Sequence, residues 1–206
     1  MSREYDASRR QQAAQRTREA ILAAAFNLHG QGILDLESLA RDADVSVATV
    51  RKHFPNREQL FQGCTAYGFH RVAVPDPAAL AAIADPAQRL TQTVIQVYAL
   101  HEALFGQEWS AYKLVDESPV MAATVDELEG LVTALVDIAN AGWNGSDEAC
   151  AATRGLVSGF LSPLTYRAFR IHGQLSPEQA TRQATAMLLQ ALQAGAVPAR
   201  EEAVHL

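Results

Sequence analysis

The sequence predicts an all-α protein of about nine helices. Apolar residues recur at helical spacing throughout the 206 residues, whereas alternating apolar and polar runs bounded by turns are absent. Breaks rich in glycine and proline separate the helical segments, at residues 30–32, 43–45, 55–56, 75–77, 85–86, 119, 142–146, 173–177 and 198. With 49% hydrophobic residues, a chain of this length can bury a substantial core.

The basic residues are concentrated at the N-terminus. The net charge is −6, but residues 1–60 carry +1 and the remainder −7. The first eighteen residues contain only two acids, Glu4 and Asp6, beside five arginines, Arg3, Arg9, Arg10, Arg16 and Arg18. Such a composition suits either a mobile arm that neutralises DNA phosphates or a tail that only solubilises the protein.

A long helix and two short ones are predicted next. The long helix carries an apolar stripe, Ile21, Leu22, Ala25, Phe26 and Leu28. Asp35 can cap a helix over 36–42, and after a short turn Ser46 can cap a second helix that runs to about His53. The apolar contacts that fix the two short helices at a steep angle come from Leu39, Ala40, Val45, Val50 and Phe54. This pattern predicts a helix-turn-helix.

The second short helix has a face suited to DNA. Once Val50 and Phe54 are packed, the opposite face presents Val47, Ala48, Thr49, Arg51, Lys52 and His53. Small side chains at its start allow close approach to base edges in a major groove about 12 Å wide. Arg51 and Lys52 could instead form only a solvated face, and His53 could bridge two helices.

A further helix is predicted to begin at Asn56. The segment Asn56-Arg57-Glu58-Gln59 forms a capping box in which Asn56 caps and Gln59 can reach back. Arg57 lies in the first turn, where the positively polarised helix start also attracts phosphate.

Residues 17–61 resemble the DNA-binding domain of TetR-type regulators. That family shows an Ile-Leu-x-Ala-Ala helix, a glycine, an Ile-Ala pair, Ala-Gly-Val-Ser, Thr-Leu-Tyr-x-His-Phe and Lys-Glu-x-Leu. The matching residues here are Ile21, Leu22, Ala24, Ala25, Gly32, Leu39, Ala40, Ala43, Val45, Ser46, Thr49, Val50, His53, Phe54, Arg57, Glu58 and Leu60.

Two departures from the family pattern stand out. Asp44 replaces the turn glycine, and Asp tolerates the left-handed conformation better than most residues, so the turn should form at modest cost. Arg51 replaces the phosphate-binding tyrosine. Arginine can contact phosphate or bind a guanine edge through two hydrogen bonds, so the family's base preference does not transfer.

The resemblance implies two domains, with DNA-binding residues in the first. Residues 1–60 would form the N-terminal arm and a three-helix helix-turn-helix domain, and residues 61–206 a larger helical domain for ligand binding and dimerisation. The residues expected at the DNA are Arg18, Ser46, Val47, Ala48, Thr49, Arg51, Lys52, His53 and Arg57.

The second domain contains long helices predicted at about 86–105, 119–141, 147–172 and 177–194. Aromatic and polar residues spaced three or four apart would line one side of a helical region, where the family builds a ligand cavity, namely Tyr98, His101, Phe105, Trp109 and Tyr112. These five could equally be ordinary core residues.

Small side chains in two of these helices suggest a four-helix dimer interface. The predicted interface residues are Ala152, Gly155, Leu156, Gly159, Phe160, Ala184, Met187, Leu188 and Ala191. The same stripes could pack only within one subunit.

The sequence gives little support for a catalytic site, a metal site, a disulfide or a membrane location. The chain has no glycine-rich phosphate loop, no GxSxG elbow and no HExxH motif, so we expect no enzyme and no cofactor. His101 and Glu102 point about 100° apart on a helix and lack a second histidine, so no metal site is expected. Cys64 and Cys150 show no paired spacing and are expected to be inert buried thiols. Without an apolar run of membrane length or a leader pattern, we expect a cytoplasmic protein that does not bind membranes.

The sequence therefore favours a dimeric transcription regulator, usually a repressor in this family. Its partners would be double-stranded DNA, a small-molecule effector and a second copy of the chain. The alternatives are a helical interaction module that has lost operator binding and, more remotely, an enzyme.

Overall fold

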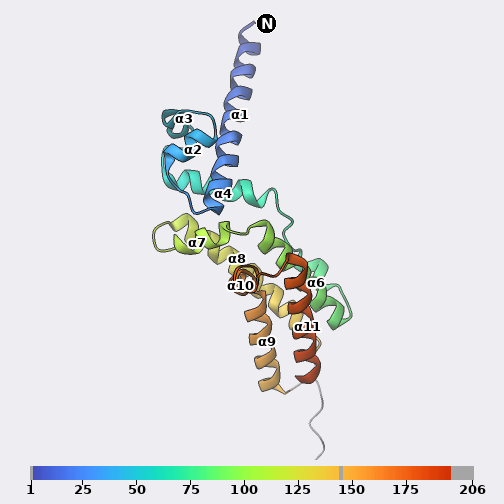
Figure 1. Cartoon of the computed structure of the whole chain (residues 1–206). Helices are drawn as coiled ribbons and strands as arrows, with labels where there is room; N and C mark the ends of the chain where they lie inside the picture. Colours follow the sequence, from blue (N-terminus) through green and yellow to red (C-terminus); the bar gives the residue numbers. More distant parts are fainter. Residues whose placement is uncertain (1, 144–145, 196–206) are drawn as a thin grey trace, which may run out of the picture. The chain divides into compact units, whose positions relative to one another are not determined.

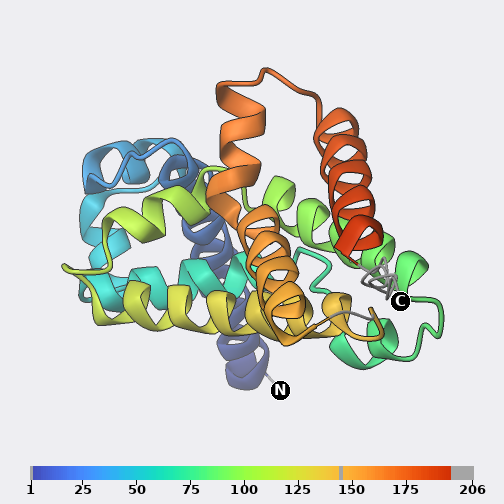
Figure 2. The same ribbon diagram turned by 90° about the horizontal axis from the view of Figure 1, so that it is seen from below.

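The computed structural model describes residues 2–143 and 146–195, and these residues form eleven α-helices without any strand (Figures 1 and 2). The all-α prediction is confirmed. The count exceeds the expected nine by two, because the short helix α7 (Gln107–Lys113) is separate within the segment predicted between the breaks at 85–86 and 119, and because a predicted helix is divided in two. The short helix α5 (Pro77–Ala81) lies within one of the nine predicted segments. The described residues fold into two compact units, residues 2–73 with 104–127, and residues 74–103 with 128–143 and 146–195.

The first unit begins with α1 (Ser2–Gly30), which extends the helical segment to the second residue of the chain (Figure 1). The N-terminal arm is therefore helical rather than irregular. Its sequence explains this, because alanine, glutamine, arginine and glutamate are good helix formers. The side chains of residues 7–16 are all exposed, so this half of α1 contributes no core.

The core of the first unit lies where α1 meets three other helices. These are α2 (Leu36–Asp42), α3 (Val47–His53) and α4 (Arg57–Phe69), whose bounds agree with the predicted helix-turn-helix. The buried apolar side chains include most of those expected from the sequence, among them Ile21, Ala25, Leu39, Ala40, Val50, Phe54 and Leu60. Burial of this cluster stabilises the packing of α2 against α3.

The first unit also contains a distant segment, residues 104–127, which no sequence pattern linked to it. Helix α7 satisfies the C-terminal carbonyls of α1: Gln107 Nε2 donates to Phe26 O at 3.1 Å, and Ser110 Oγ donates to His29 O at 2.6 Å. Gly106 has a φ of 93°, and a Cβ there would lie 2.3 Å from the carbonyl oxygen of Gly30. Only glycine permits this close approach.

The second unit is built around α6 (Pro86–Ala103), which packs against α11 (Pro177–Gly195). Helix α11 also packs against α9 (Asp147–Leu161), beside which it runs in the pictures (Figures 1 and 2). Helix α8 (Pro119–Asn140) contributes its residues from Leu128 onward to this unit. Buried apolar residues from all four helices form the core, including Leu90, Val94, Val97, Leu135, Val157, Leu161, Ala184 and Leu188.

A single helix over 147–172 was predicted, and this expectation is wrong. The chain breaks at Ser162, whose φ of −66° and ψ of 138° are extended, and α10 (Pro163–Ile171) begins at the next residue. The reason is that proline disfavours helical backbone in the residue before it, while its fixed φ suits the first position of a new helix. Ser162 then caps α10 by accepting a hydrogen bond from Leu164 N at 3.2 Å.

A buried arginine holds the end of α8 in the second unit. Arg89 is 7% exposed and donates to the carbonyl oxygens of Ile83 at 2.7 Å, Ile138 at 3.0 Å and Ala141. Two of these carbonyls belong to the C-terminal end of α8, where the helix dipole favours a cation. Arg89 is therefore held by carbonyl groups of its own chain.

Candidate nucleic-acid interface

The short helix α3 is defined at both ends by its own sequence. Ser46 caps it, because Thr49 N donates to Ser46 Oγ at 3.1 Å, and the two hydroxyl oxygens lie 2.9 Å apart. Asp35 caps α2 in the same way through Ser38 N at 2.7 Å, and Asn56 caps α4 through Gln59 N at 2.9 Å. All three predicted caps are confirmed, and they determine where the helices of the motif begin.

The predicted DNA-facing residues of α3 divide by exposure. Ala48, Arg51 and Lys52 are exposed together with the capping Ser46, whereas Val47, Thr49 and His53 are half-buried. Val47 packs against the core cluster of the first unit, so only part of this side chain remains on the surface. The outward face of α3 is therefore small near its start and positively charged near its end.

The turn between α2 and α3 takes the predicted conformation. Asp44 has a φ of 52°, in the left-handed region that favours glycine. The neighbouring contacts hold it there: Asp44 N donates to Arg41 O at 3.2 Å, and Val45 N donates to Ala40 O at 2.9 Å. Asp therefore replaces the glycine of the family pattern without loss of the turn.

Arg18 connects α1 to the end of α3. Its Nη1 donates to the carbonyl oxygen of His53 at 3.2 Å, and its guanidinium carbon lies 4.2 Å from the centre of the Phe54 ring. The carbonyl groups at a helix C-terminus attract a cation, and an aromatic face does so as well. Arg18 was predicted to lie at the DNA, and the structure gives it this internal role at the base of α3.

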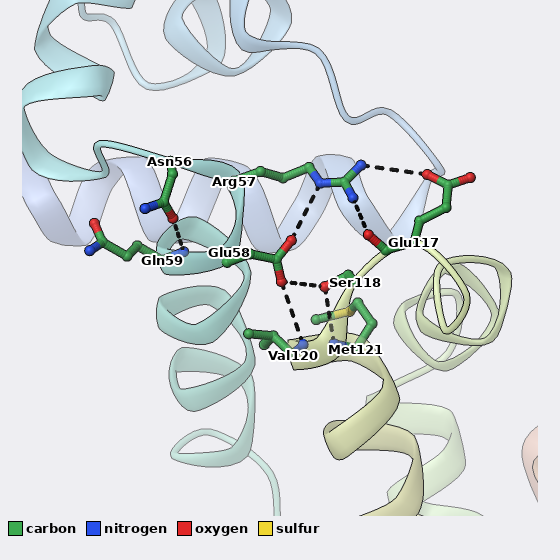
Figure 3. A network of polar contacts seen from close by, with 8 residues as sticks. All are labelled: Asn56, Arg57, Glu58, Gln59, Glu117, Ser118, Val120 and Met121. Atoms are coloured by element: carbon green, nitrogen blue, oxygen red, sulfur yellow. Dashed lines mark hydrogen bonds and ion pairs between the residues drawn. The ribbon is translucent and has the colours of Figure 1, made fainter.

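Arg57 is held by the segment that precedes α8. Its Nη2 donates to the carbonyl oxygen of Glu117 at 2.6 Å, Nη1 lies 3.5 Å from Glu117 Oε2, and Nε lies 3.6 Å from Glu58 Oε1 (Figure 3). The side chain remains 48% exposed. Arg57 was predicted to bind a phosphate, and in this structure its guanidinium already has oxygen partners within the chain.

Sequence reasoning missed the partners of Arg57. Ser118 followed by Pro119 is a recognisable helix start, and Met121 N donates to Ser118 Oγ at 3.2 Å, as such a pattern predicts. Nothing in the sequence indicates that this helix start lies beside Arg57 and Glu58, because the two segments are about 60 residues apart.

The five predicted effector-site residues do not line one helix. Helix α6 ends at Ala103, and Gly106 with its positive φ redirects the chain, so Tyr98 and His101 fall in the second unit while Phe105, Trp109 and Tyr112 fall in the first. The spacing of three and four residues suggested one continuous helix, and the glycine interrupts it. Their shared stripe is therefore not formed.

Tyr98 and His101 are buried structural residues of the second unit. Tyr98 is 1% exposed and its hydroxyl donates to Phe160 O at 2.8 Å; His101 is fully buried, with Nε2 lying 2.9 Å from Leu161 O. A carbonyl oxygen can only accept, so Nε2 of His101 carries a proton. Burial raises the pKa of Tyr98 above its ordinary value.

A groove between α6 and α11 lies next to these residues. It encloses about 580 Å³ and is lined mostly by apolar surface, with Ile95, Tyr98 and Ala99 contributed by α6 and Thr181 by α11. Glu102 and Arg182 also line it. A volume of this size falls in the range that small-molecule sites occupy, roughly 300–1,000 Å³.

The predicted dimer residues form two groups. On α9, Ala152, Gly155, Leu156 and Gly159 are exposed, and a Cβ added at either glycine would meet no atom within 4 Å. On α11, Met187 is 49% exposed, but Ala184 and Leu188 are fully buried within the single chain. Both predicted stripes lie on helices, but Ala184 and Leu188 face the core of the chain itself and have no exposed surface for a partner. Phe160 and Ala191 are half-buried.

Other expected features are reported for the described residues only. No three His, Cys, Asp or Glu side chains in this part of the chain are arranged to hold a metal ion. None of its helices combines the length and apolar character needed to cross a membrane. Both cysteines are free thiols; Cys64 is buried, which raises its pKa to about 12, and Cys150 is half-buried.

The fold is shared with solved structures of transcription regulators. A transcriptional regulator from Rhodococcus sp. Rha1 matches with a TM-score of 0.55 and 17% identity over 88% of this chain and 99% of the other. NalD, the secondary repressor of the MexAB-OprM multidrug efflux pump in Pseudomonas aeruginosa, gives 0.52 and 18% over 87% and 97%. The multidrug binding protein EbrR, solved with imidazole, gives 0.51 and 20% over 89% and 97%.

Sequence comparison adds nothing to this likeness, because neither a family model nor a curated protein matches the chain. A putative TetR-family transcriptional regulator from Rhodococcus sp. gives a TM-score of 0.55 and 16% identity, over 89% of this chain and 100% of the other. The match covers 97–100% of the length of each of these proteins. The chain therefore has the fold of the TetR-family transcriptional regulators.

Proposed function

We propose that this protein is a DNA-binding transcription regulator, acting as a repressor, that binds an inverted-repeat operator as a homodimer and responds to a small molecule. The outward face of α3 carries the proposal. Ala48 allows close approach to base edges, and Arg51 and Lys52 supply positive charge on the exposed side of a helix fixed by the Ser46 cap.

The dimer part of the proposal rests on the surface of α9 and α11. Gly155 and Gly159 leave open space over α9, and Met187 exposes half of an apolar side chain on α11, which packs beside α9. A helix from a second subunit could approach such a face closely. A two-fold dimer with one α3 in each subunit requires an inverted repeat.

The effector part of the proposal rests on the groove between α6 and α11. The apolar lining favours a ligand with a large apolar surface, and Glu102 and Arg182 add charged side chains to that lining. The solved relatives EbrR and NalD, described as a multidrug binding protein and as a repressor of a multidrug efflux pump, are consistent with an effector of this kind.

Selection of duplexes from a random pool tests the DNA-binding function directly. We expect wild-type protein to enrich an inverted repeat whose half-sites lie on one face of the duplex. Arg51→Ala and Lys52→Ala should each weaken binding without unfolding the protein, because both side chains are exposed. Losing a phosphate contact lowers the salt slope by about one unit, and losing a bidentate guanine contact costs about 1–3 kcal/mol and relaxes one base position.

The matched control is Arg71→Ala, which removes the same charge from an exposed arginine that follows the C-terminal end of α4. It should leave operator affinity nearly unchanged. If wild-type protein enriches no sequence, or if neither α3 variant differs from Arg71→Ala, the helical interaction module becomes the better description.

The groove is tested by filling it. Ala99 is exposed and lines the groove, so Ala99→Trp should abolish the thermal stabilisation given by any compound that stabilises wild-type protein. Ala186→Trp places the same side chain at an exposed position of α11 outside the groove lining and should preserve the response. Equal responses in both variants would place the effector site elsewhere.

A further inference from the structure

The guanidinium of Arg57 contacts oxygen atoms of two glutamates and the ring of Phe61. Glu117 supplies a carbonyl oxygen at 2.6 Å and a carboxylate oxygen at 3.5 Å, and Glu58 supplies a carboxylate oxygen at 3.6 Å (Figure 3). The ring of Phe61 lies below, 5.4 Å from the guanidinium carbon. Carboxylate and carbonyl oxygens thus take the positions that phosphate oxygens would take around an arginine.

A second set of contacts fixes the segment that carries Glu117. Glu58 Oε2 accepts a hydrogen bond from Ser118 Oγ at 2.6 Å and lies 3.4 Å from Val120 N (Figure 3). Ser118 is 1% exposed, and Phe61 packs with Leu114 and Met121 in a small buried cluster beneath it. The start of α4 and the start of α8 are therefore joined by a half-buried anchor, Glu58–Ser118, and by an exposed contact, Arg57–Glu117.

The proposed function places Arg57 near a DNA phosphate. It occupies the first position of α4, three residues after Phe54 ends α3, and Asn56 caps the helix beside it. The start of a helix of this length carries partial positive charge, which adds to the attraction for an anion. The same side chain is thus available to two anionic partners that cannot both hold it fully.

We propose that Glu117 is an intramolecular competitor for Arg57, so that operator binding replaces the Glu117 carboxylate by a DNA phosphate. This inference rests on the proposed function and specifies how its DNA-binding surface is regulated. The Glu58–Ser118 anchor keeps Glu117 beside Arg57, and Glu58 acts as a positioning residue. Any displacement of the first turn of α8 therefore changes how readily Arg57 reaches DNA.

The exposure of the Arg57–Glu117 ion pair indicates a contact that can open, rather than one that is permanently formed. The side chains of Arg57 and Glu117 are 48% and 62% exposed, whereas Ser118 is buried. Exposed ion pairs contribute little because water screens them, so this one opens readily. The competition should consequently change operator affinity by about two- to fivefold rather than by orders of magnitude.

The experiment measures operator affinity, at one salt concentration, for Glu117→Gln and for the control Asp116→Asn. Asp116 is exposed and adjacent, so its substitution removes the same charge without touching Arg57. We expect Glu117→Gln to tighten binding about two- to fivefold beyond Asp116→Asn. In an Arg57→Gln background, Glu117→Gln should bring no gain beyond the control. Unchanged melting temperatures would exclude altered folding as the cause.

Two outcomes overturn the inference while leaving the proposed function intact. One is operator binding that responds equally to Glu117→Gln and Asp116→Asn. The other is a gain in affinity that persists after Arg57 has been replaced. Failure of wild-type protein to select any duplex is different, because it removes the proposed function and this inference together. The ¹⁵N–¹H signals of the Arg57 Nη groups, which contact Glu117, give a DNA-free check, and they should shift in Glu117→Gln but not in Asp116→Asn.

Discussion

The hydroxyl of Tyr98 donates a hydrogen bond to the carbonyl oxygen of Phe160 at 2.8 Å, across 62 residues of sequence. This contact belongs to a set that completes the end of α9. Pro163 cannot donate to Gly159 O, so Thr165 Oγ1 does so at 2.6 Å, and His101 Nε2 donates to Leu161 O at 2.9 Å. Three side chains thus replace three helical donors lost at the Ser162–Pro163 break.

Removing the Tyr98 hydroxyl should destabilise the second unit. In Tyr98→Phe the Phe160 carbonyl loses its partner in a buried environment, which costs about 1–3 kcal/mol. Urea unfolding followed by Trp143 fluorescence measures the effect in a Trp109→Phe background, because Trp143 belongs to this unit and Trp109 to the first. Tyr67→Phe is the control, since the Tyr67 ring packs on Phe26 but its hydroxyl bonds to none of the described residues; it should change stability by less than about 0.5 kcal/mol.

Gly106→Ala should destabilise the first unit strongly. A Cβ at this position would lie 2.3 Å from the Gly30 carbonyl oxygen, and the φ of 93° is unfavourable for alanine. The combined cost is about 2–4 kcal/mol or more, because the backbone must move. Gly130→Ala serves as the opposite case: it is an exposed helical position with no atom near the added Cβ, and should gain about 0.5–1 kcal/mol. Equal melting temperatures for the two variants would contradict the close approach of α1 and residue 106.

His29 should make the stability of the protein depend on pH. Burial lowers the pKa of His29 from 6.5 to about 4, because the charged imidazolium is poorly solvated beside Phe61. The unfolded chain therefore binds more protons than the folded one between these values, so the free energy of unfolding falls as the pH falls from about 6.5 to 4. The loss is on the order of 3 kcal/mol.

The pH dependence is checked by thermal unfolding of wild type and His29→Gln between pH 7 and 4. Other acidic groups contribute to both proteins, so the difference between the two curves isolates His29. We expect the free energy of unfolding of wild type, relative to that of His29→Gln, to fall steadily as the pH falls. A constant difference would mean that His29 titrates alike in folded and unfolded chains.

Arg18→Ala should weaken the base of the helix-turn-helix before any DNA is added. The variant loses the hydrogen bond to His53 O and the contact with the Phe54 ring, for a cost of about 1–2 kcal/mol. Arg16→Ala removes the same charge from an exposed position of α1 and should leave the melting temperature unchanged. If Arg18→Ala weakens DNA binding while stability stays at the wild-type value, Arg18 acts at the DNA instead.

Gly159→Leu should prevent subunit association without harming the subunit. The added side chain meets no atom of its own chain, but it would occupy the proposed contact in both subunits, where overpacking costs about 1–3 kcal/mol each. Sedimentation at low micromolar concentration should show monomers, with unfolding close to that of the control Gly130→Leu, which places leucine on an open position of α8. A Gly159→Leu protein that remains dimeric would place the interface elsewhere.

The helix-turn-helix could be predicted from the sequence because its determinants are local. Asp35, Ser46 and Asn56 each cap a helix by binding a backbone N–H three residues later, and Asp44 adopts its turn conformation within the same segment. Apolar spacing then indicates which face is buried. Helix bounds, caps and most of the core in residues 17–61 followed from these short-range rules. The helix break at Ser162 has an equally local cause, Pro163, although apolar periodicity alone predicted one continuous helix over 147–172.

Tertiary structure alone decided which distant groups meet. The outward orientation of Arg51 and Lys52 was predictable, but the capture of Arg57 by Glu117 and the use of Arg18 beneath α3 were not. Likewise, periodicity placed Ala184 on a small-residue stripe, and only packing revealed that this edge faces the subunit's own core. The physical reason is that caps and periodicity act within a few residues, whereas a guanidinium takes whichever oxygen the folded chain brings within reach, here one that is 60 residues away.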